Sequence, residues 1–499
     1  MPRPTRVAVA ILSWNGRRHL ETCLPALQHQ RDPGVPWQVI VLDNGSADDT
    51  VAWVKQHHPW VRLVESRHNL GFCGGVNRLV AAADDADAIA LLNNDTRPTD
   101  GWLAALVDAL AAAPDAVAAV SGKIVDWSGA RLDFGGGAMT FDGHAFQIGY
   151  GRPLDEAPIP ADGAALPFAC GGNLLIWRDA FLAAGGFDEA YFAYLEDVDL
   201  GWRLWSMGRE IRFAADAVVH HRSMATSDLL GRHHRGFLFE RNAFLTAYKN
   251  YDDALWPAVM PAVLLAFHHR IQTLLVQSNP GGAQLTFDPY AGLIANTQPR
   301  RPGDAGNPAA GSTGGGAVDG ADGDAGPDAG ATRADGIDRR GALAKLRAFG
   351  AGEFLRRGVR KAARRTLPAW FFAPLGTPTR GAGAHAEMPI LAEAALAHET
   401  RIVDGRTVAH LRAHTFLLGH LDRADADRRA VQARRVRPDA DYFARFPAYL
   451  VPTYPGDDRL FASAGFASWL PDALPIRRAA LDELVAERGA DAGPASTGD

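Results

Sequence analysis

The first 250 residues alternate short runs of β-branched and aliphatic residues with longer runs that are rich in Ala and Leu. We expect strands at 7–13, 37–45, 61–66 and 88–95, and helices at 18–30, 48–58 and 74–83. Regular alternation of strand and helix is typical of a mostly parallel sheet with helices on both faces. The pattern therefore predicts an α/β fold, in which ligands bind beyond the carboxyl ends of the strands.

The composition changes near residue 296, and this change divides the chain. Residues 301–337 are Gly, Ala, Asp and Pro with almost no large apolar side chains, so they cannot bury enough surface to become ordered. We predict five parts, which are an α/β domain at 1–252, an apolar helical extension at 253–296, a disordered linker at 297–338, a basic amphipathic helix at 339–375 and a helical region of unassigned role at 376–499.

Composition also bounds the partners and the compartment. The chain has 47% hydrophobic and 22% charged residues, and its formal net charge of −6 gives no sign of a nucleic-acid partner. The cysteines, Cys23, Cys73 and Cys170, lie far apart without a CxxC pair, which favours a reducing cytosol. The N-terminal apolar run stops at Ser13, which is too short for a signal peptide and is better explained as a buried strand. We therefore expect a cytoplasmic location.

Two stretches could contact a membrane. Residues 254–267 are apolar, but a spanning helix needs roughly 20 such residues, so a buried or interfacial segment is the preferred interpretation. From Arg339 to Arg365 the chain has ten Lys or Arg residues and one acid, Glu353. Residues 339–372 therefore have the pattern of a basic amphipathic helix, which could lie on an anionic membrane or pack on its own protein. The first alternative would hold the protein at the inner face of the plasma membrane.

Polar and glycine-rich segments follow three of the predicted strands. Asp43 precedes Asn-Gly-Ser, so it either forms a turn and cap or binds the base or ribose of a ligand. The segment 69–77, NLGFCGGVN, either allows close approach of backbone to a ligand or forms a tight turn, and it matches neither a Walker loop nor the dinucleotide fingerprint. In LLNNDTRP, 91–98, side-chain oxygens at a strand end suit Mg²⁺ or Mn²⁺, and a turn before Pro98 is the structural alternative.

The segment 191–204, YFAYLEDVDLGWRL, places acids among aromatic and aliphatic residues, and a buried charge needs a partner. A helix that begins near Glu196 would hold the acids in its first turn, where the macrodipole stabilises them. Asp199 could pair with Arg203, which lies four residues later. Glu196 and Asp197 would then remain at the mouth of an aromatic cleft, where a carboxylate could take a proton from a hydroxyl group.

Two other features flank this segment. Before it, Gly171 and Gly172 again permit close approach of backbone to a ligand. After it, His220 and His221 end another predicted strand in AVVHHRS. Either histidine could bind a metal or a phosphate, although such a pair is more often structural.

These motifs, in this order, resemble family 2 glycosyltransferases with the GT-A fold. The resemblance covers about residues 5–251 and rests on SWNG, VLDNGS, NLGFCGG, LLNND, GGFDEAYFAYLEDVDLGWRL and AVVHH. It looks closest to the bacterial rhamnosyltransferase-like branch, helped by RNAFLTAYKNY at 241–251. The resemblance implies a Rossmann-like mixed sheet flanked by helices, and an inverting enzyme that uses a divalent cation, Mg²⁺ or Mn²⁺. The donor would be a dTDP- or UDP-sugar, and rhamnose is the first candidate for the transferred sugar. The acceptor would be a hydroxyl of a glycan or lipid-linked molecule in cell-surface polysaccharide biosynthesis.

The resemblance also implies a role for each matching position. Asp197 would be the general base, and Glu196 would help to position the acceptor. Asp95 and His220 would bind the metal, with Asn93 in place of the first acid of the family's DxD-type motif. Donor binding is implied for Ser13, Asn15, Asp43, Gly45, Gly71, Gly74, Gly75, Asn77, Asn94 and Asp95. Acceptor binding is implied for Gly171, Gly172, Asn173 and Trp202.

Two other functions compete with glycosyl transfer. A nucleotidyltransferase could use a similar sheet, because fold alone does not fix function. However, SWNGRRHL lacks the Gly-rich loop with Arg and Lys that such an enzyme would carry after its first strand. A catalytically silent sugar-nucleotide-binding module is disfavoured by the intact acids at 95, 196 and 197. A structure that gathers Asp43, Asp95, Asp197 and His220 around one cleft would support the enzyme.

Overall fold

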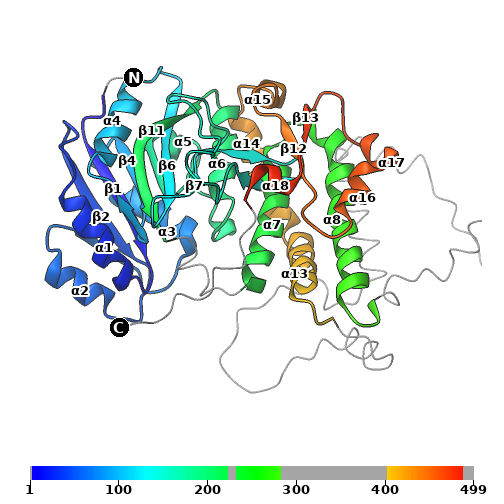
Figure 1. Cartoon of the computed structure of the whole chain (residues 1–499), viewed down its shortest axis with the longest axis horizontal. Helices are drawn as coiled ribbons and strands as arrows, with labels where there is room; N and C mark the ends of the chain where they lie inside the picture. The colour runs from blue at the N-terminus through cyan, green and yellow to red at the C-terminus, as the bar shows by residue number, and fades with distance from the viewer. Residues whose placement is uncertain (1–2, 223–231, 283–401, 487–499) are drawn as a thin grey trace, which may run out of the picture. The chain divides into compact units, whose positions relative to one another are not determined.

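The computed structural model describes residues 3–222, 232–282 and 402–486 (Figure 1). The strands of the large sheet in these ranges are β1 (Val7–Ser13), β2 (Trp37–Asp43), β3 (Arg62–Glu65), β4 (Ala88–Asn93), β5 (Thr96–Pro98), β6 (Val117–Asp126), β7 (Leu132–Phe134), β10 (Asn173–Trp177) and β11 (Glu210–His221). The helices of the first 282 residues are α1 (Arg17–Gln28), α2 (Thr50–His57), α3 (Gly71–Ala82), α4 (Trp102–Ala112), α5 (Arg178–Ala183), the 3₁₀ helix η1 (Glu189–Tyr191), α6 (Glu196–Ser206), α7 (Arg232–Asn250) and α8 (Trp256–Ser278).

The large sheet is mixed, in the order β3-β2-β1-β4-β10-β6-β11-β5, with β7 paired to β6. Strands β1 to β4 are parallel to one another, whereas β10 is antiparallel to both β4 and β6. The strand β1 is an almost fully buried apolar run, as expected for a strand covered on both faces. The predicted α/β fold is confirmed, and the predicted strands appear as β1 to β4 with small differences at their ends.

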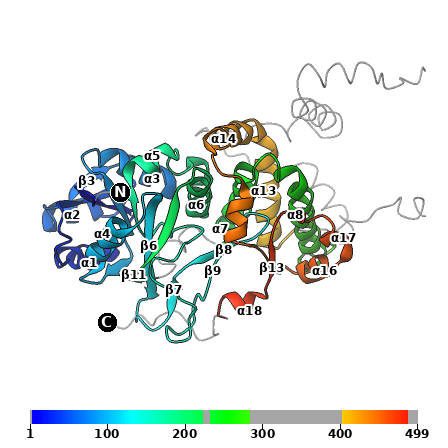
Figure 2. The same cartoon turned by 90° about the horizontal axis from the view of Figure 1, so that it is seen from above.

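Helices cover both faces of the sheet. The amide of Arg31, just beyond α1, donates to Asp100, just before α4, so these two helices lie on one face. Asn77 of α3 bonds to the backbone of Phe187, just beyond α5, so these helices share the other face. Figure 2, seen from above, shows the sheet between the two layers. The carboxyl ends of β1 and β4 remain open between them.

The described part of the C-terminal region, 402–486, belongs to the same compact unit as the sheet. It contains α13 (Gly405–Gly419), α14 (Leu421–Arg434), α15 (Asp439–Arg445), β12 (Ala448–Leu450), α16 (Asp457–Ala462), α17 (Ala464–Ala467), β13 (Ile476–Arg478) and α18 (Leu481–Leu484). The strands β12 and β13 pair with each other, and a second small sheet pairs β8 (Gly137–Met139) with β9 (Ala145–Gln147). Both α13 and α14 pack against α7 (Figure 1). The domain boundaries stay a prediction, and the linker at 297–338 and the basic helix at 339–375 lie outside the described residues.

Buried polar contacts fasten this region to the rest of the unit. The Trp202 indole N–H donates to Asp439 Oδ1 over 2.9 Å, and the Trp202 ring stacks on Tyr442. Glu240 of α7, almost fully buried, forms ion pairs with His144 and with His410 of α13. The C-terminal helices are therefore an integral part of this unit.

The helix α8 is the described helix that is long and apolar enough to cross a membrane. It is weak evidence for a span, because core helices pass the same test. Part of α8 is buried inside the protein, and its Arg270 forms buried ion pairs with Asp142 and Asp457. These contacts favour a core helix, in agreement with the preferred interpretation of residues 254–267.

A buried ionic cluster joins α6 to α7. Asp199 is fully buried and accepts hydrogen bonds from Arg203, at 2.8 and 3.0 Å, and from Asn250 at 2.8 Å. The Lys249 ammonium lies 3.1 Å from Asp199 Oδ1, the oxygen that also accepts from Asn250, and it also pairs with Asp188. Burial would raise the pKa of Asp199, but the charges of Arg203 and Lys249 hold it below its ordinary value. The predicted pairing of Asp199 with Arg203 is present.

We predict that Asp199→Asn lowers the free energy of unfolding by about 3–5 kcal/mol, because it leaves buried cations without their counter-charge. Denaturant titration at neutral pH measures this loss. The exposed Asp216→Asn is the matched control and should change stability by less than about 0.5 kcal/mol. Equal stability of the two variants would mean that the cluster contributes little.

Candidate active site

Two cavities in the described part of the chain meet at the carboxyl ends of the strands. The strand-end cavity, of about 330 Å³, is lined by residues of β1, β4 and their following loops, including Leu12, Trp14, Asn93, Asn94 and Asp95. The aromatic cavity, of about 1020 Å³, is lined mainly by aromatic and aliphatic side chains. The residues that line both cavities are Cys170, Tyr194, Glu196, Asp197 and His221. The two acids therefore stand at the boundary between the cavities.

The acids Glu196 and Asp197 begin α6. Asp197 is half-buried and accepts backbone N–H groups from Gly171, at 3.4 Å, and from Val198 at 2.9 Å. Glu196 is more deeply buried, and its Oε2 has no hydrogen-bond partner among the described residues. Burial raises the pKa of both carboxyls, and the charge of Asp197 raises that of Glu196 further. At neutral pH this favours a proton on Glu196 and a negative charge on Asp197.

The segment that leads into α6 has an unusual backbone. Phe192, Tyr194 and Leu195 have φ of 62°, 72° and 64°, in the left-handed region that non-glycine residues rarely adopt. Such residues cost about 1–3 kcal/mol each and persist only where the surroundings enforce them. Asn242 of α7 supplies that constraint, because its amide donates to the carbonyls of residues 191, 193 and 194 at 2.7–3.1 Å. The contacts from α7 thus fix the backbone that leads into α6, and with it the direction in which α6 begins.

The same segment also closes the start of α3. The carbonyl of Phe192 accepts the backbone N–H groups of Phe72 and Cys73, at 2.6 and 3.2 Å. Gly71 has φ of 73°, and a Cβ there would lie 2.5 Å from the Phe192 ring, so this position requires glycine. The predicted close approach at 69–77 is therefore an approach of the Phe192 segment, and Gly71 also lines the strand-end cavity. Gly74 and Gly75 lie within α3, where a Cβ on Gly75 would meet Leu12.

The loops after β1 and β2 bind each other. Asn15 accepts the Ala47 N–H, and its own N–H donates to Ser46, both at 2.8 Å. Asp43 is buried, and its Oδ2 accepts the Ser46 N–H, while Oδ1 has no partner within the described ranges. A buried carboxylate oxygen without a partner favours a ligand over a purely structural turn, because desolvation is costly. Asp43 is nevertheless not among the described residues that line either cavity, so the expected gathering with Asp95 and Asp197 is incomplete. Gly45, with φ of 79°, forms the turn beside it.

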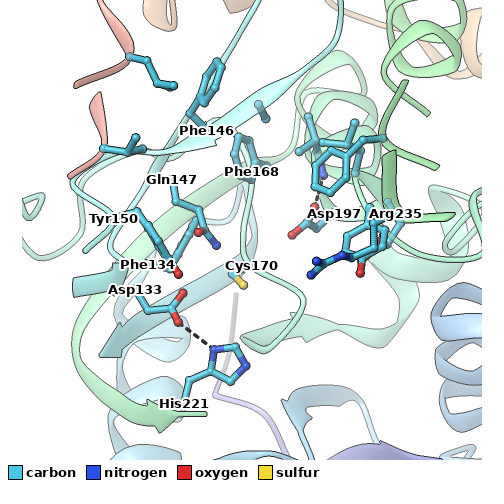
Figure 3. A pocket seen from close by; sticks show the side chains of 18 of the residues that line it. Asp133, Phe134, Phe146, Gln147, Tyr150, Phe168, Cys170, Asp197, His221 and Arg235 are labelled. Atoms are coloured by element: carbon cyan, nitrogen blue, oxygen red, sulfur yellow. Dashed lines mark hydrogen bonds and ion pairs between the residues drawn. The ribbon is translucent and has the colours of Figure 1, made fainter. Parts of the chain in front are cut away.

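Asp95 lies just beyond β4 and faces His221 at the end of β11. His221 Nε2 is 3.4 Å from Asp95 Oδ1, and its Nδ1 is 2.9 Å from Asp133 Oδ2. Burial would raise the pKa of Asp95, but His221 holds it below its ordinary value. Burial would lower the pKa of His221, but the hydrogen bonds to Asp133 and Asp95 raise it to about 10. Figure 3 shows Asp133 and His221 on one side of the aromatic cavity and Asp197 with Arg235 on the other.

The histidine beside Asp95 is therefore His221, where the sequence led us to expect His220. His220 is not among the described residues that line either cavity, and its ring lies against Gly129. Side chains alternate along a strand, so only one of two neighbours can face the site. A bulge in β11, between Ala214 and Val218, changes the register and sets which one does. The sequence named both histidines as candidates, but only the structure selects His221 and reveals Asp133 as its partner.

Asp95 and His221 could together hold a divalent cation. A carboxylate and a neutral imidazole are suitable donors, so a cation would displace the Nε2 proton that His221 shares with Asp95. Asp133 would fix the ring through the opposite nitrogen, as outer partners of metal-binding histidines do. In the described part of the chain, no group of three or more His, Cys, Asp or Glu is placed to hold a metal. The protein would thus supply few of the ligands, which leaves positions for water or a diphosphate.

Several predicted site residues have structural partners instead. Asn94 donates to Ser13 Oγ at 3.2 Å, which ties β1 to β4 beside Asp95. The Asn77 amide both donates to and accepts from the backbone of Phe187. Asn173 is fully buried and bonds to the Trp102 indole and to backbone carbonyls.

Trp202 is also fully buried, against Asp439, and lies outside the described lining of both cavities. Asn173 and Trp202 thus do not reach the acceptor position expected for them. Gly171 and Gly172 do line the strand-end cavity.

Comparisons with known proteins show the family to which the chain belongs. The family model for glycosyl transferase family 2 matches residues 8–183. The N-acetylglucosaminyl-diphospho-decaprenol L-rhamnosyltransferase of Mycobacterium tuberculosis is 30% identical over 265 residues, which are 47% of this chain and 84% of the relative. The sequences of two strains, CDC 1551 and H37Rv, match equally well.

Solved structures are more distant. The crystal structure of GalNAc-T7 with UDP, GalNAc and Mn²⁺ has a TM-score of 0.41 and 13% identity, and the match covers 58% of this chain but only 53% of that one. The mannosyltransferase PcManGT from Pyrobaculum calidifontis, in complex with GDP-Man and Mn²⁺, has a TM-score of 0.34 and 17% identity over 59% of this chain and 84% of its own. The assignment rests on the family model and the mycobacterial relative. The chain belongs to glycosyltransferase family 2, and it is a glycosyltransferase with a GT-A-like mixed sheet.

Proposed function

We propose that this enzyme transfers a sugar from a nucleoside-diphosphate sugar to a hydroxyl of a lipid-linked glycan, with inversion at the anomeric carbon of the transferred sugar. Rhamnose is the first candidate for that sugar. The observation that carries the proposal is the position of Asp197 and Glu196 at the boundary of the two cavities. The strand-end cavity would hold the donor and the aromatic cavity the acceptor. The mycobacterial relative is an L-rhamnosyltransferase that acts on a lipid-linked acceptor, which supports both the sugar and the acceptor proposed here.

The nucleotide is proposed to bind at the ends of β1 and β2. Asp43, with its unpartnered Oδ1, would accept a hydrogen bond from the base. The remaining candidate donor contacts are backbone and side-chain groups beside Gly45, Asn15, Asn94 and Gly71. A dTDP-sugar is the first candidate donor, with UDP-hexoses second.

Asp197 would be the general base. An acceptor hydroxyl that enters from the aromatic cavity would give its proton to Asp197 while its oxygen bonds to the sugar carbon and the bond to the diphosphate breaks. The raised pKa of Asp197 suits this task, since a base works best when its pKa lies near the working pH. Glu196, which keeps its proton, would donate a hydrogen bond that positions the acceptor.

Asp95 and His221 would hold a Mg²⁺ or Mn²⁺ ion, with Asp133 orienting the imidazole. A bound divalent cation would neutralise the negative charge of the departing diphosphate. We also propose that the enzyme works at the inner face of the plasma membrane, because its proposed acceptor is anchored there. The segment 339–372, which would make that contact, lies outside the described residues.

We predict that Asp197→Asn reduces glycosyl transfer by about 10²–10⁴-fold, because the general base is lost. The assay screens dTDP-, UDP- and GDP-sugars against N-acetylglucosamine linked through diphosphate to a ten-carbon prenyl chain. Glu196→Gln is the matched control and should retain much more activity, since glutamine resembles a protonated Glu196. Full transfer by Asp197→Asn would move the role of base to another residue.

The pH profile gives a second test of the same assignment. Because the folded-state pKa of Asp197 is raised, kcat/KM should fall as pH drops through a value above the ordinary carboxyl range. This acid limb should persist in Glu196→Gln, because Asp197 still titrates there. Disappearance of the limb in Glu196→Gln would instead identify Glu196 as the base.

We predict that His221→Gln weakens Mn²⁺ binding by about 10–100-fold, because a proposed donor of the site is lost. The adjacent His220→Gln is the matched control and should bind Mn²⁺ like the wild type. Electron paramagnetic resonance titration of free Mn²⁺ measures binding directly, and EDTA should abolish transfer by the wild type. Equal binding by the two variants, or full transfer in EDTA, would contradict the proposed metal site.

A further inference from the structure

The aromatic cavity has a wall that comes from the far end of the described chain. Leu481, Val485 and Ala486, in and just after α18, line it together with the exposed acid Asp482. Almost 300 residues separate Leu481 from Asp197, and the wall lies outside the residues matched by the family model. We call the segment 481–486 the C-terminal wall.

The C-terminal wall is fastened to the loop after β9. The Gly149 N–H donates to the Leu484 carbonyl at 2.6 Å, and the Ala486 N–H donates to the Tyr150 carbonyl at 2.8 Å. The Arg152 guanidinium donates to the carbonyls of Asp482 and Glu483, both at 2.9 Å. These bonds satisfy the last carbonyls of a very short helix, which would not be stable alone.

Apolar packing completes the attachment. Leu484 is buried in a small core with Ala138, Tyr449 and Val451, and Val485 packs against the same cluster. The core joins β8 to β12, so the wall is held on both sides. Leu481, by contrast, is 39% exposed and free of this core, so its side chain is available at the cavity.

The cavity has the size and chemistry for more than one sugar ring. Its volume of about 1020 Å³ is at the upper end of the range that buries a drug-sized ligand. Phe146, Tyr150 and Phe239 lie among its lining residues, together with the aliphatic side chains of the C-terminal wall. Arg235 also lines it, and Figure 3 shows this side chain beside Asp197.

We propose that the C-terminal wall is a specificity determinant, which binds the apolar chain of the acceptor just beyond its diphosphate. This inference rests on the proposed function, because the reacting hydroxyl must reach Asp197. The sugar would then lie at the inner end of the cavity, the diphosphate near Arg235, and the first prenyl units against Leu481 and Val485. In this arrangement the sugar hydroxyl meets the acid Asp197, the diphosphate meets the cation Arg235, and the prenyl chain meets the apolar side chains of the C-terminal wall.

The test uses two substitutions in the wall. Leu481→Trp fills the cavity from a partly exposed position, so the fold should tolerate it. Val485→Thr keeps the side-chain volume but places a hydroxyl in the apolar surface. The control is Leu418→Trp on α13, because Leu418 is also 39% exposed and is not among the described lining residues. Thermal unfolding verifies that each variant is folded.

Transfer is measured with two acceptors that share N-acetylglucosamine and diphosphate, one with a ten-carbon prenyl chain and one with a methyl group. We expect Leu481→Trp to raise KM for the prenyl acceptor about tenfold and Val485→Thr a few fold, with little change for the methyl acceptor. Leu418→Trp should behave like the wild type. An equal effect on both acceptors, or no effect from either wall variant, would overturn the inference.

A binding experiment separates this inference from the proposed function. Geranyl diphosphate is titrated in EDTA by calorimetry, with inorganic diphosphate as the comparison, and no turnover is needed. The wild type should bind geranyl diphosphate more tightly, and both wall variants should lose that difference. Failure of the wild type to prefer geranyl diphosphate would overturn the role of the wall. Absence of transfer from every sugar nucleotide, with this preference intact, would instead count against the proposed donor and reaction.

Discussion

The buried carboxylate of Asp199 is the interaction on which the position of the site depends. It lies in the first turn of α6 together with Glu196 and Asp197, and its partners come from α6 and α7. The Arg203 guanidinium also donates to the carbonyls of Ala184 and Gly186, and the Lys249 ammonium also donates to Asp188. The loops before α6 are thus fixed by the same charges that hold the helix. Because an unpaired buried charge is costly, α6 can lie in only one orientation relative to α7.

That orientation permits the strained backbone before α6. Arg241 and Asn242 of α7 bind carbonyls within and beside the left-handed residues, which are those of Tyr191, Ala193 and Tyr194. The carbonyl of Phe192 in turn closes the start of α3. The segment from Phe192 to Tyr194 therefore lines the strand-end cavity and leads through Leu195 into Glu196 and Asp197. A displacement of α7 would move both, so the two cavities are mechanically coupled through this segment. This explains why polar residues recur in the RNAFLTAYKNY stretch, which has no direct place in the cavities.

Sequence patterns predicted the features that depend on neighbouring residues alone. The strands β1 to β4 follow from apolar runs with turn residues at their ends, and the start of α6 and the pairing of Asp199 with Arg203 follow from helical spacing. Contacts between residues far apart in the sequence determine which of the predicted side chains reach the site. The bulge in β11 selects His221 over His220, and Asp439, more than 230 residues away, buries Trp202. The C-terminal wall could not be foreseen, because nothing in residues 481–486 indicates which cavity they line.

The three acids in the first turn of α6 show how partners, and not the helix, assign their roles. All three lie at the same positive end of the helix dipole, which would lower each pKa by a similar small amount. Burial raises each of them, yet the pKa of Asp199 lies below its ordinary value while those of Glu196 and Asp197 lie above. The difference is that Arg203 and Lys249 pair directly with Asp199. The buried cations therefore stabilise the charge of the structural acid Asp199, whereas Glu196 and Asp197, which lack these two partners, face the cavities where a substrate can bind.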